Sequence, residues 1–201
     1  MDEFAPGIRR VCVAFDLERD SGRSTMEVRR LRLQLATTIA ESCSMAGLDR
    51  MLLNHQAMDE VEILLLPAGI DEPQAVTSLV NGFFQALRRI NGQFRGGARV
   101  RLKVAVHEGI TVLAAGGFVG RVVTKTCRML AAPPLRDALA RCPRSDLAVL
   151  ISDQVFEDID SFDQGLPLDE FEQVQIDDPS LRFRGGAWIF VPDQSCPQLY
   201  V

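Results

Sequence analysis

A few residues of this sequence are of types, and at positions, that commonly take part in catalysis or ligand binding. Asp16 lies at the end of the apolar segment VAFDL, where a carboxylate either binds a cation or caps the following turn. Gly117 and Gly120 belong to a glycine-rich turn before an amphipathic segment, which forms either an anion-binding nest or an ordinary loop. Thr124 and Arg128 are four residues apart and share a helical face, where Arg128 also suits a salt bridge with a surface acid.

Motifs of the common catalytic families are missing. The sequence contains neither G-x-x-x-x-G-K-[ST] nor G-x-S-x-G, and His107-Glu108 is not continued into H-E-x-x-H because position 111 is threonine. His107 is therefore expected to pack or hydrogen-bond within a sheet. The five cysteines never form C-x-x-C, so they indicate neither a zinc knuckle nor a disulfide framework, and Cys127 is best interpreted as a small core residue.

Hydrophobic periodicity predicts an α+β domain. The order of elements begins β-α-β-β-α-β, which predicts a ferredoxin-like core, with a central mostly antiparallel sheet, helices packed on it and a C-terminal extension. The expected strands cover residues 10–17, 51–54, 61–67, 99–109, 147–152, 172–176 and 187–191. The expected helices cover residues 25–46, 74–92, 120–140 with a bend or interruption at Pro133-Pro134, and 155–159.

The composition indicates one globular domain. Of 201 residues, 47% are hydrophobic and 24% are charged, which excludes collagen-like chains, disordered chains and disulfide scaffolds. We expect a single domain over residues 8–192, with tails at 1–7 and 193–201. The net charge of -5 argues against nucleic acid or an anionic membrane as a partner, because both attract basic surfaces.

The sequence also predicts a bacterial cytoplasm as its setting. It shows no signal peptide and no membrane-spanning segment. An odd number of cysteines fits a reducing compartment. Arginine supplies 20 of the 22 basic residues and lysine only 2, a bias typical of a GC-rich coding sequence.

Four separated segments, in the same order, resemble the class III nucleotide cyclase (adenylate/guanylate cyclase) homology domain. The resemblance covers about residues 8–160, and the overall pattern is similar to a compact actinobacterial cyclase-like family. VAFDL is similar to the family's F-x-D-I, and QAMDE before VEILLLP is similar to K-x-x-G-D before an apolar strand. LKVAVHEG is similar to R-I-G-I-H-x-G, and GFVGRVVTKTCRML is similar to D-V-W-G-x-x-V-N-x-A-x-R-L.

The resemblance implies metal-binding and base-recognition positions. Asp16 matches the first metal-binding aspartate and Glu60 the second, although a one-residue shift of the hairpin would make Asp59 the second acid. Asp59 and Glu60 are also consistent with an ordinary solvated turn that binds no metal. Gln56 and Gly117 match the two base-recognition positions, and Gly117 has no side chain with which to read a base.

At several positions this sequence differs from the residues that carry out the reaction of the family. In that reaction two metal ions activate the ribose 3′-hydroxyl, an asparagine positions the ribose, and an arginine stabilises charge on the phosphate. Gly120 and Arg128 match the family's glycine and arginine. Thr124 stands at the asparagine and is too short for an amide's two contacts, and Arg19 replaces a glycine after the first strand. Because small misplacements slow such reactions strongly, these changes predict a degenerate site.

The favoured hypothesis is a degenerate cyclase-like domain that acts as a regulatory or protein-interaction module and retains nucleoside triphosphate binding. An active nucleotidyl cyclase and a scaffold without a ligand are the alternatives. Mg²⁺ or Mn²⁺ is expected only together with a nucleotide. The resemblance also implies a head-to-tail homodimer, or a heterodimer with a related domain, across an apolar groove lined by Phe118, Val119, Val122 and Val123.

Overall fold

The computed structural model describes residues 6–18, 25–48, 54–58, 61–92, 99–114, 117–162, 165–180 and 183–192. Strands and helices alternate along the chain. In order they are β1 (Ile8–Leu17), α1 (Thr25–Met45), β2 (Asn54–Met58), β3 (Val61–Leu65), α2 (Glu72–Gly92), β4 (Leu102–Ala114), β5 (Gly117–Val119), α3 (Arg121–Ala131), α4 (Pro133–Arg141), β6 (Leu147–Ser152), α5 (Asp153–Asp160), the 3-10 helix η1 (Leu168–Glu170), β7 (Glu172–Asp178) and β8 (Phe183–Phe190).

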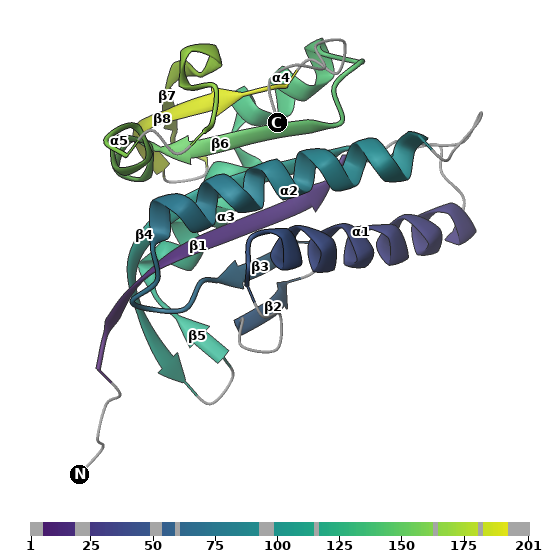
Figure 1. Ribbon diagram of the computed structural model, residues 1–201. Helices are drawn as coiled ribbons and strands as arrows, with labels where there is room; N and C mark the ends of the chain where they lie inside the picture. Colours follow the sequence, from purple (N-terminus) through teal and green to yellow (C-terminus); the bar gives the residue numbers. More distant parts are fainter. Residues whose placement is uncertain are drawn as a thin grey trace.

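One sheet organises the molecule (Figure 1). Its strand order is β2-β3-β1-β4-β6-β8-β7, and β5 pairs separately with β4. The neighbouring strands are antiparallel except for β4 and β6, which are parallel. The first four strands, with α1 and α2 between them, form the expected β-α-β-β-α-β unit, so the α+β fold class predicted from the sequence is confirmed.

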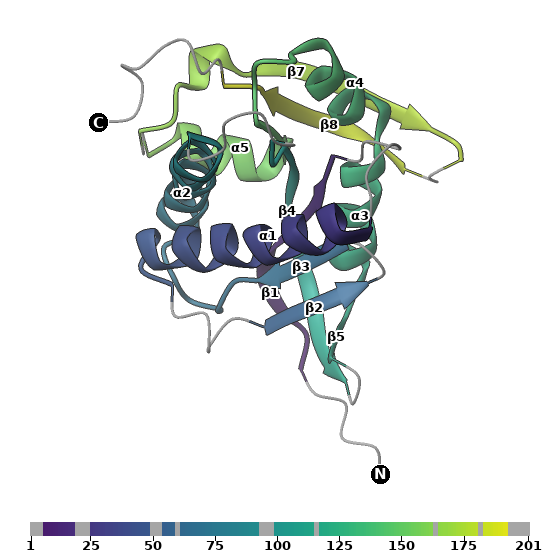
Figure 2. The ribbon, with the colours of Figure 1, turned by 90° about the vertical axis from the view of Figure 1, so that its right-hand side faces the viewer.

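Helices cover both faces of the sheet (Figure 2). Side chains alternate between the faces of a strand, so Val13 and Phe15 of β1 enter the core shared with α1 and α2. Cys12 and Ala14 enter the opposite core, which they share with α3 and α4. The alternation places Asp16 on the α3 face, because it continues the row of Cys12 and Ala14.

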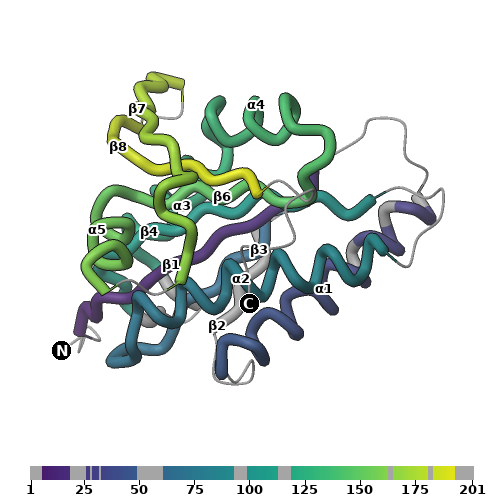
Figure 3. Tube along the Cα trace, turned by 45° about the horizontal axis from the view of Figure 1, so that its top comes forward, coloured from purple at the N-terminus to yellow at the C-terminus, as the bar shows by residue number. Residues whose placement is uncertain are grey.

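The two long helices on one face lie side by side (Figure 3). A glycine makes this close approach possible, because a Cβ built at Gly82 of α2 would lie 2.7 Å from the Cα of Ser42 in α1. The end of α2 is held by Asn91, whose side chain forms 2.8 Å hydrogen bonds with both the N–H and the carbonyl oxygen of Val100. The helix end and the start of β4 are thereby joined.

The expected long helix after Gly120 is interrupted, as the sequence predicts. Ala132, with φ -65° and ψ 142°, separates α3 from α4 in an extended conformation. A residue before proline is pushed out of the helical region, and Pro133 then begins α4, a position where the missing N–H costs nothing. Two helices therefore form where a continuous one would otherwise run.

The hairpin differs from the prediction. We expected strands at 51–54 and 61–67 with a polar turn from His55 to Glu60, but β2 occupies Asn54–Met58 and only 59–60 separate it from β3. Residues 51–53 and 59–60 lie outside the described part of the chain. The polar composition of β2 suggested a turn, but among the described strands β2 is at the edge of the sheet and pairs with β3 alone. An edge strand tolerates polar residues that a central strand does not. Among the described residues, no helix has the length and apolar character needed to cross a membrane.

Candidate functional site

An ion pair lies at the carboxyl end of β1. In the antiparallel register Asp16 is directly opposite Lys103 of β4, and the Oδ2 and Nζ atoms are 3.2 Å apart. Each side chain is 18% exposed, so both charges are largely withdrawn from water. Partial burial strengthens the attraction relative to a pair on the surface. The carboxylate that the sequence predicts to bind a metal ion therefore already lies beside the ammonium group of Lys103.

A second ion pair follows on the same face. Glu18, which follows β1, pairs with Arg101, which precedes β4, and each lies two residues from a member of the first pair. The same guanidinium donates hydrogen bonds of 2.7 to 2.9 Å to the backbone carbonyls of Leu139, Cys142 and Ser145. A cation suits these acceptors because the last carbonyls of a helix carry partial negative charge. Arg101 thus joins the end of β1 to the end of α4 and the turn before β6.

The start of β3 lies next to this end of β1. Continuing the observed β1–β3 register by one step places Asp16 opposite Val61, the first residue of β3. The predicted proximity of Asp16 to the hairpin therefore agrees with the flanking backbone. Asp59 and Glu60 themselves lie outside the described residues, so their assignment as metal ligands stays a prediction.

The two base-recognition candidates lie in strands. Gln56 is in β2, opposite Ile63, and its side chain is outside the described part of the structure. Gly117 begins β5 and lies opposite Ala114 of β4. Their roles stay predictions.

Helix α3 carries the other candidates. Thr124 is exposed and Arg128 is half-buried. The residue that forms the ion pair with Asp16 is Lys103 of β4, not a residue of α3. Gly120, just before the helix, has a structural reason to be glycine. A Cβ built there would lie 2.5 Å from the carbonyl oxygen of Ile110, so the turn is pressed against β4. This observation favours the loop interpretation of Gly120 over an anion-binding nest.

A buried histidine lies beneath α3. His107 is 7% exposed and stands opposite Cys12 on the α3 face, in agreement with the expectation that it packs within the sheet. Its Nδ1 is buried and has no hydrogen-bond partner among the described residues. Burial, and to a smaller extent the positive charge of Lys125, lowers the pKa of His107 from 6.5 to about 4. The imidazole is therefore neutral at pH 7.

The neighbouring thiols have the properties of core residues. Burial raises the pKa of Cys12 to about 12, although a hydrogen bond with Thr126 acts in the opposite direction. Burial also raises the pKa of Cys127, which packs against the α3 core as the sequence suggests. Because the thiolate is the reactive form, neither cysteine is suited to nucleophilic chemistry.

Two of the four residues expected to line an apolar groove at the start of α3 are buried instead. Val122 and Val123 are 2% and 7% exposed and pack in the chain's own core. Val119 is 54% exposed, and the side chain of Phe118 lies outside the described residues. The expectation was wrong for the two valines because an amphipathic helix turns its apolar stripe toward the nearest sheet before any partner can cover it.

Sequence analysis missed Lys103 and Arg101. A signal was present, since acids at positions 16 and 18 and bases at 101 and 103 both repeat every second residue, the period that places side chains on one face of a strand. The signal becomes readable only when the antiparallel register of β1 and β4 is known, because 83 residues separate Glu18 from Arg101.

The described residues do not by themselves form a metal centre. Among them, no group of three or more histidine, cysteine, aspartate or glutamate side chains is arranged to hold a metal ion. Asp16 supplies one carboxylate, whose Oδ2 is in contact with the ammonium group of Lys103.

Comparison with known proteins identifies the fold. No protein-family model and no curated protein sequence matches this chain. The guanylyl cyclase Cya2 superposes with a TM-score of 0.66 at 15% identity, covering 98% of each chain. An adenylate/guanylate cyclase/hydrolase from Silicibacter pomeroyi superposes with a TM-score of 0.65 at 17% identity, covering 94% of this chain and 100% of that one.

A third similar structure is the monomeric guanylyl cyclase domain of the RhoGC fusion protein from the aquatic fungus Blastocladiella emersonii. Its TM-score is 0.58 at 13% identity, and the superposition covers 93% of this chain and 97% of that one. These matches extend over nearly the whole chain. The fold is therefore that of adenylate and guanylate cyclase domains, as the resemblance in the sequence implies.

Proposed function

We propose that this chain is a nucleotide cyclase-like domain with a degenerate site, which binds a nucleoside triphosphate and acts as a regulatory or protein-interaction module. The ion pair between Asp16 and Lys103, 3.2 Å long, carries the proposal. In the reaction implied by the resemblance this aspartate holds a metal ion. A carboxylate with a cation already beside it attracts a second cation more weakly, so the first requirement of the reaction is weakened.

The residues expected to position the nucleotide support low turnover. Thr124 is exposed on α3 and offers one hydroxyl where an asparagine would offer an amide. Gly117 offers no side chain for base recognition. Losing about 1 Å of positional precision can cost roughly a hundredfold in rate, so these changes together favour binding over catalysis.

The metal in this proposal accompanies the nucleotide. Mg²⁺ or Mn²⁺ would bind with the triphosphate, whose oxygens complete a coordination shell that Asp16 begins. The same proposal assigns the second carboxylate to Glu60, or to Asp59 if the hairpin is shifted by one residue. The ion would supply charge neutralisation at the phosphates when bound.

Isothermal titration calorimetry with ATP, GTP, CTP and UTP, each with and without Mn²⁺, tests the proposal. We expect binding of at least one nucleotide in the presence of Mn²⁺ and no binding of Mn²⁺ alone. Mass spectrometry of the incubated nucleotide should show cyclic product near background. Asp16→Asn is the matched control because it removes the charge and keeps the shape. If none of the four nucleotides binds, the scaffold hypothesis replaces this one.

The alternative function is an active nucleotidyl cyclase that forms a cyclic mononucleotide. Continuing the β1–β3 register places Asp16 opposite Val61, and Asp59 and Glu60 directly precede Val61 in the sequence, which favours this alternative. A cyclic product well above background that disappears in Asp16→Asn would establish this alternative and remove the degenerate one.

We further propose that the domain forms a homodimer or a heterodimer with a related domain. One similar structure is described as a dimeric guanylyl cyclase domain and another as a monomeric one. In this chain the end of β4 and β5 project from the body as an arm (Figure 1). On this arm Ile110 is 56% exposed and Val119 is 54% exposed. Val119 is opposite Val112, which shares a face with Ile110, so the three apolar side chains form one surface suited to a second copy.

Sedimentation equilibrium tests the dimer. Ile110→Glu should shift the protein toward a 22.2 kDa monomer, because a charge cannot be buried in an apolar interface without a partner. Leu33→Glu is the matched control, since Leu33 is 65% exposed on α1 and away from the arm. A monomer at all micromolar concentrations, or equal effects of both changes, would contradict the proposal.

The proposed setting is the cytoplasm, with neither nucleic acid nor membrane as a partner. Among the described cysteines, Cys12, Cys43, Cys127 and Cys142 are free thiols. Free thiols are typical of a reducing compartment. The net charge of -5 supports the exclusion of polyanionic partners.

A further inference from the structure

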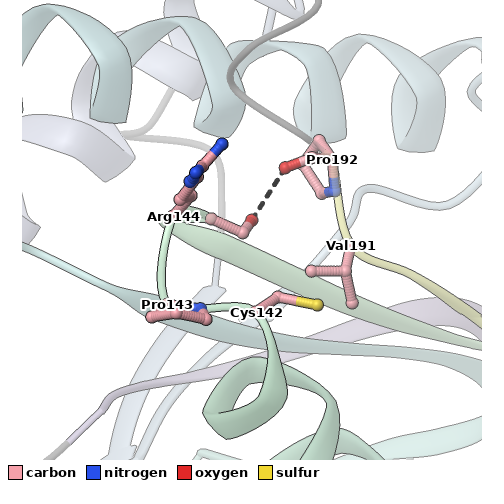
Figure 4. A pocket seen from close by; sticks show the side chains of 6 residues that line it. Cys142, Pro143, Arg144, Val191 and Pro192 are labelled. Carbon is pink, nitrogen blue, oxygen red and sulfur yellow. Dashed lines mark hydrogen bonds between the residues drawn. The ribbon is translucent and has the colours of Figure 1, made fainter.

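A cavity lies at the turn between α4 and β6, and Asp16 is not among its lining residues. Its volume is about 300 Å³, at the lower end of the range for small-molecule sites. Figure 4 shows Arg144 and Pro192 across from each other, with Cys142 and Val191 beside them. The complete lining is Cys142, Pro143, Arg144, Ser145, Val191 and Pro192.

Hydrogen bonds hold the walls of this cavity in place. The Ser145 hydroxyl lies 2.8 Å from the carbonyl oxygens of Leu147 and Pro192, and its hydrogen can be donated to either. Arg101 donates to the carbonyl of Ser145, and Arg99 donates to the carbonyl of Arg144 at 3.0 Å. These contacts fix the backbone of the cavity walls, which lowers the conformational entropy that the protein would lose when a ligand binds.

The lining combines one cation with an apolar wall. Pro143, Val191 and Pro192 supply hydrocarbon, and the polar atoms of the Ser145 side chain are already engaged. Arg99 is paired with Asp146, and Arg101 is paired with Glu18. By contrast, within the described ranges no acid pairs with the guanidinium of Arg144. The lining therefore places the positive charge of Arg144 next to the apolar side chains of Pro143, Val191 and Pro192.

We propose that this cavity binds a small monocarboxylate with a compact apolar body. The carboxylate would pair with the Arg144 guanidinium, for which a planar two-oxygen anion is the best geometric match. The apolar body would contact Val191 and the two prolines. Because Arg101 connects this turn to Glu18, such a ligand would contact a segment that is fastened to the end of β1.

The exposed thiol of Cys142 provides a direct test. The protein is equilibrated with the disulfide of 3-mercaptobenzoate or of 3-mercaptobenzamide in excess free thiol, and peptide mass spectrometry measures the mixed disulfide at Cys142. The two probes have the same ring and differ only in charge. We expect about a two- to fivefold larger fraction of the benzoate adduct, the range for a solvent-accessible charge pair.

Variants separate the contributions of charge and apolar surface. Arg144→Gln should bring the benzoate-to-benzamide ratio close to one, whereas Arg141→Gln removes the same charge outside the lining and should leave the ratio unchanged. Val191→Ser should lower both adducts and leave their ratio unchanged. A ratio near one in the unaltered protein, an equal response to both arginine changes, or aromatic adducts unaffected by Val191→Ser would overturn the proposal.

Discussion

Acidification should destabilise this protein through His107. The imidazole is 7% exposed, its Nδ1 lacks a hydrogen-bond partner among the described residues, and Lys125 adds a positive charge nearby. All three features disfavour the protonated form in the folded state. The unfolded chain has none of them, so the histidine there keeps a pKa near 6.5.

The size of the effect follows from the two pKa values. The folded state has a pKa of about 4 and the unfolded state 6.5, and each pH unit between them corresponds to about 1.4 kcal/mol. Above pH 6.5 both states are neutral and the group contributes nothing. As the pH falls from 6.5 toward 4 only the unfolded state binds the proton, so the free energy of unfolding decreases. The loss reaches about 3 kcal/mol at pH 4, and about 2 kcal/mol at pH 5.

Urea denaturation at half-unit steps from pH 4 to pH 8 measures this loss. The pH-dependent loss in the unaltered protein should exceed that of His107→Gln by about 2 kcal/mol at pH 5, because glutamine does not titrate. Titrating carboxylates are common to both proteins and cancel in the difference. His55→Gln, which removes the chain's other histidine, is the control and should follow the unaltered protein. Parallel curves for the unaltered protein and His107→Gln would refute the reasoning.

Further variants test the packing and the ion pairs. Gly120→Ala should lower the free energy of unfolding by about 1–3 kcal/mol, because its Cβ would meet a β4 carbonyl oxygen at 2.5 Å, whereas Gly92→Ala, with open space around it, should raise it by less than about 1 kcal/mol. Arg101→Lys should cost about 1–3 kcal/mol by the same assay, since an ammonium group cannot reach three backbone carbonyls together, and a cost below about 0.5 kcal/mol would contradict this role. Lys103→Met should make Mn²⁺ binding detectable by electron paramagnetic resonance without nucleotide, and adding Asp16→Asn should abolish that binding. If Lys103→Met binds no Mn²⁺ under these conditions, the ammonium group is not what prevents metal binding.

Much of the fold could be predicted because local periodicity sets it. Alternating and continuous apolar residues located β1, β4 and β6, and the spacing of Leu31, Leu35 and Ile39 located the buried side of α1. Pro133 explained the break between α3 and α4. The order of these elements was enough to predict the ferredoxin-like unit, because short connections leave few ways to join them.

Tertiary structure decided which charged groups meet. The sequence identified Asp16, but only the register of β1 against β4 places Lys103 opposite it, and registers between distant strands depend on the whole buried face. The polar segment of β2 became a strand because pairing with β3 satisfies its backbone, a stabilisation that local composition does not reveal. Val122 and Val123 became core residues because the sheet was the nearest apolar surface. The sequence by itself therefore determined the elements and the candidate acid, whereas long-range strand pairing and packing determined the partner of that acid and the surfaces left for other molecules.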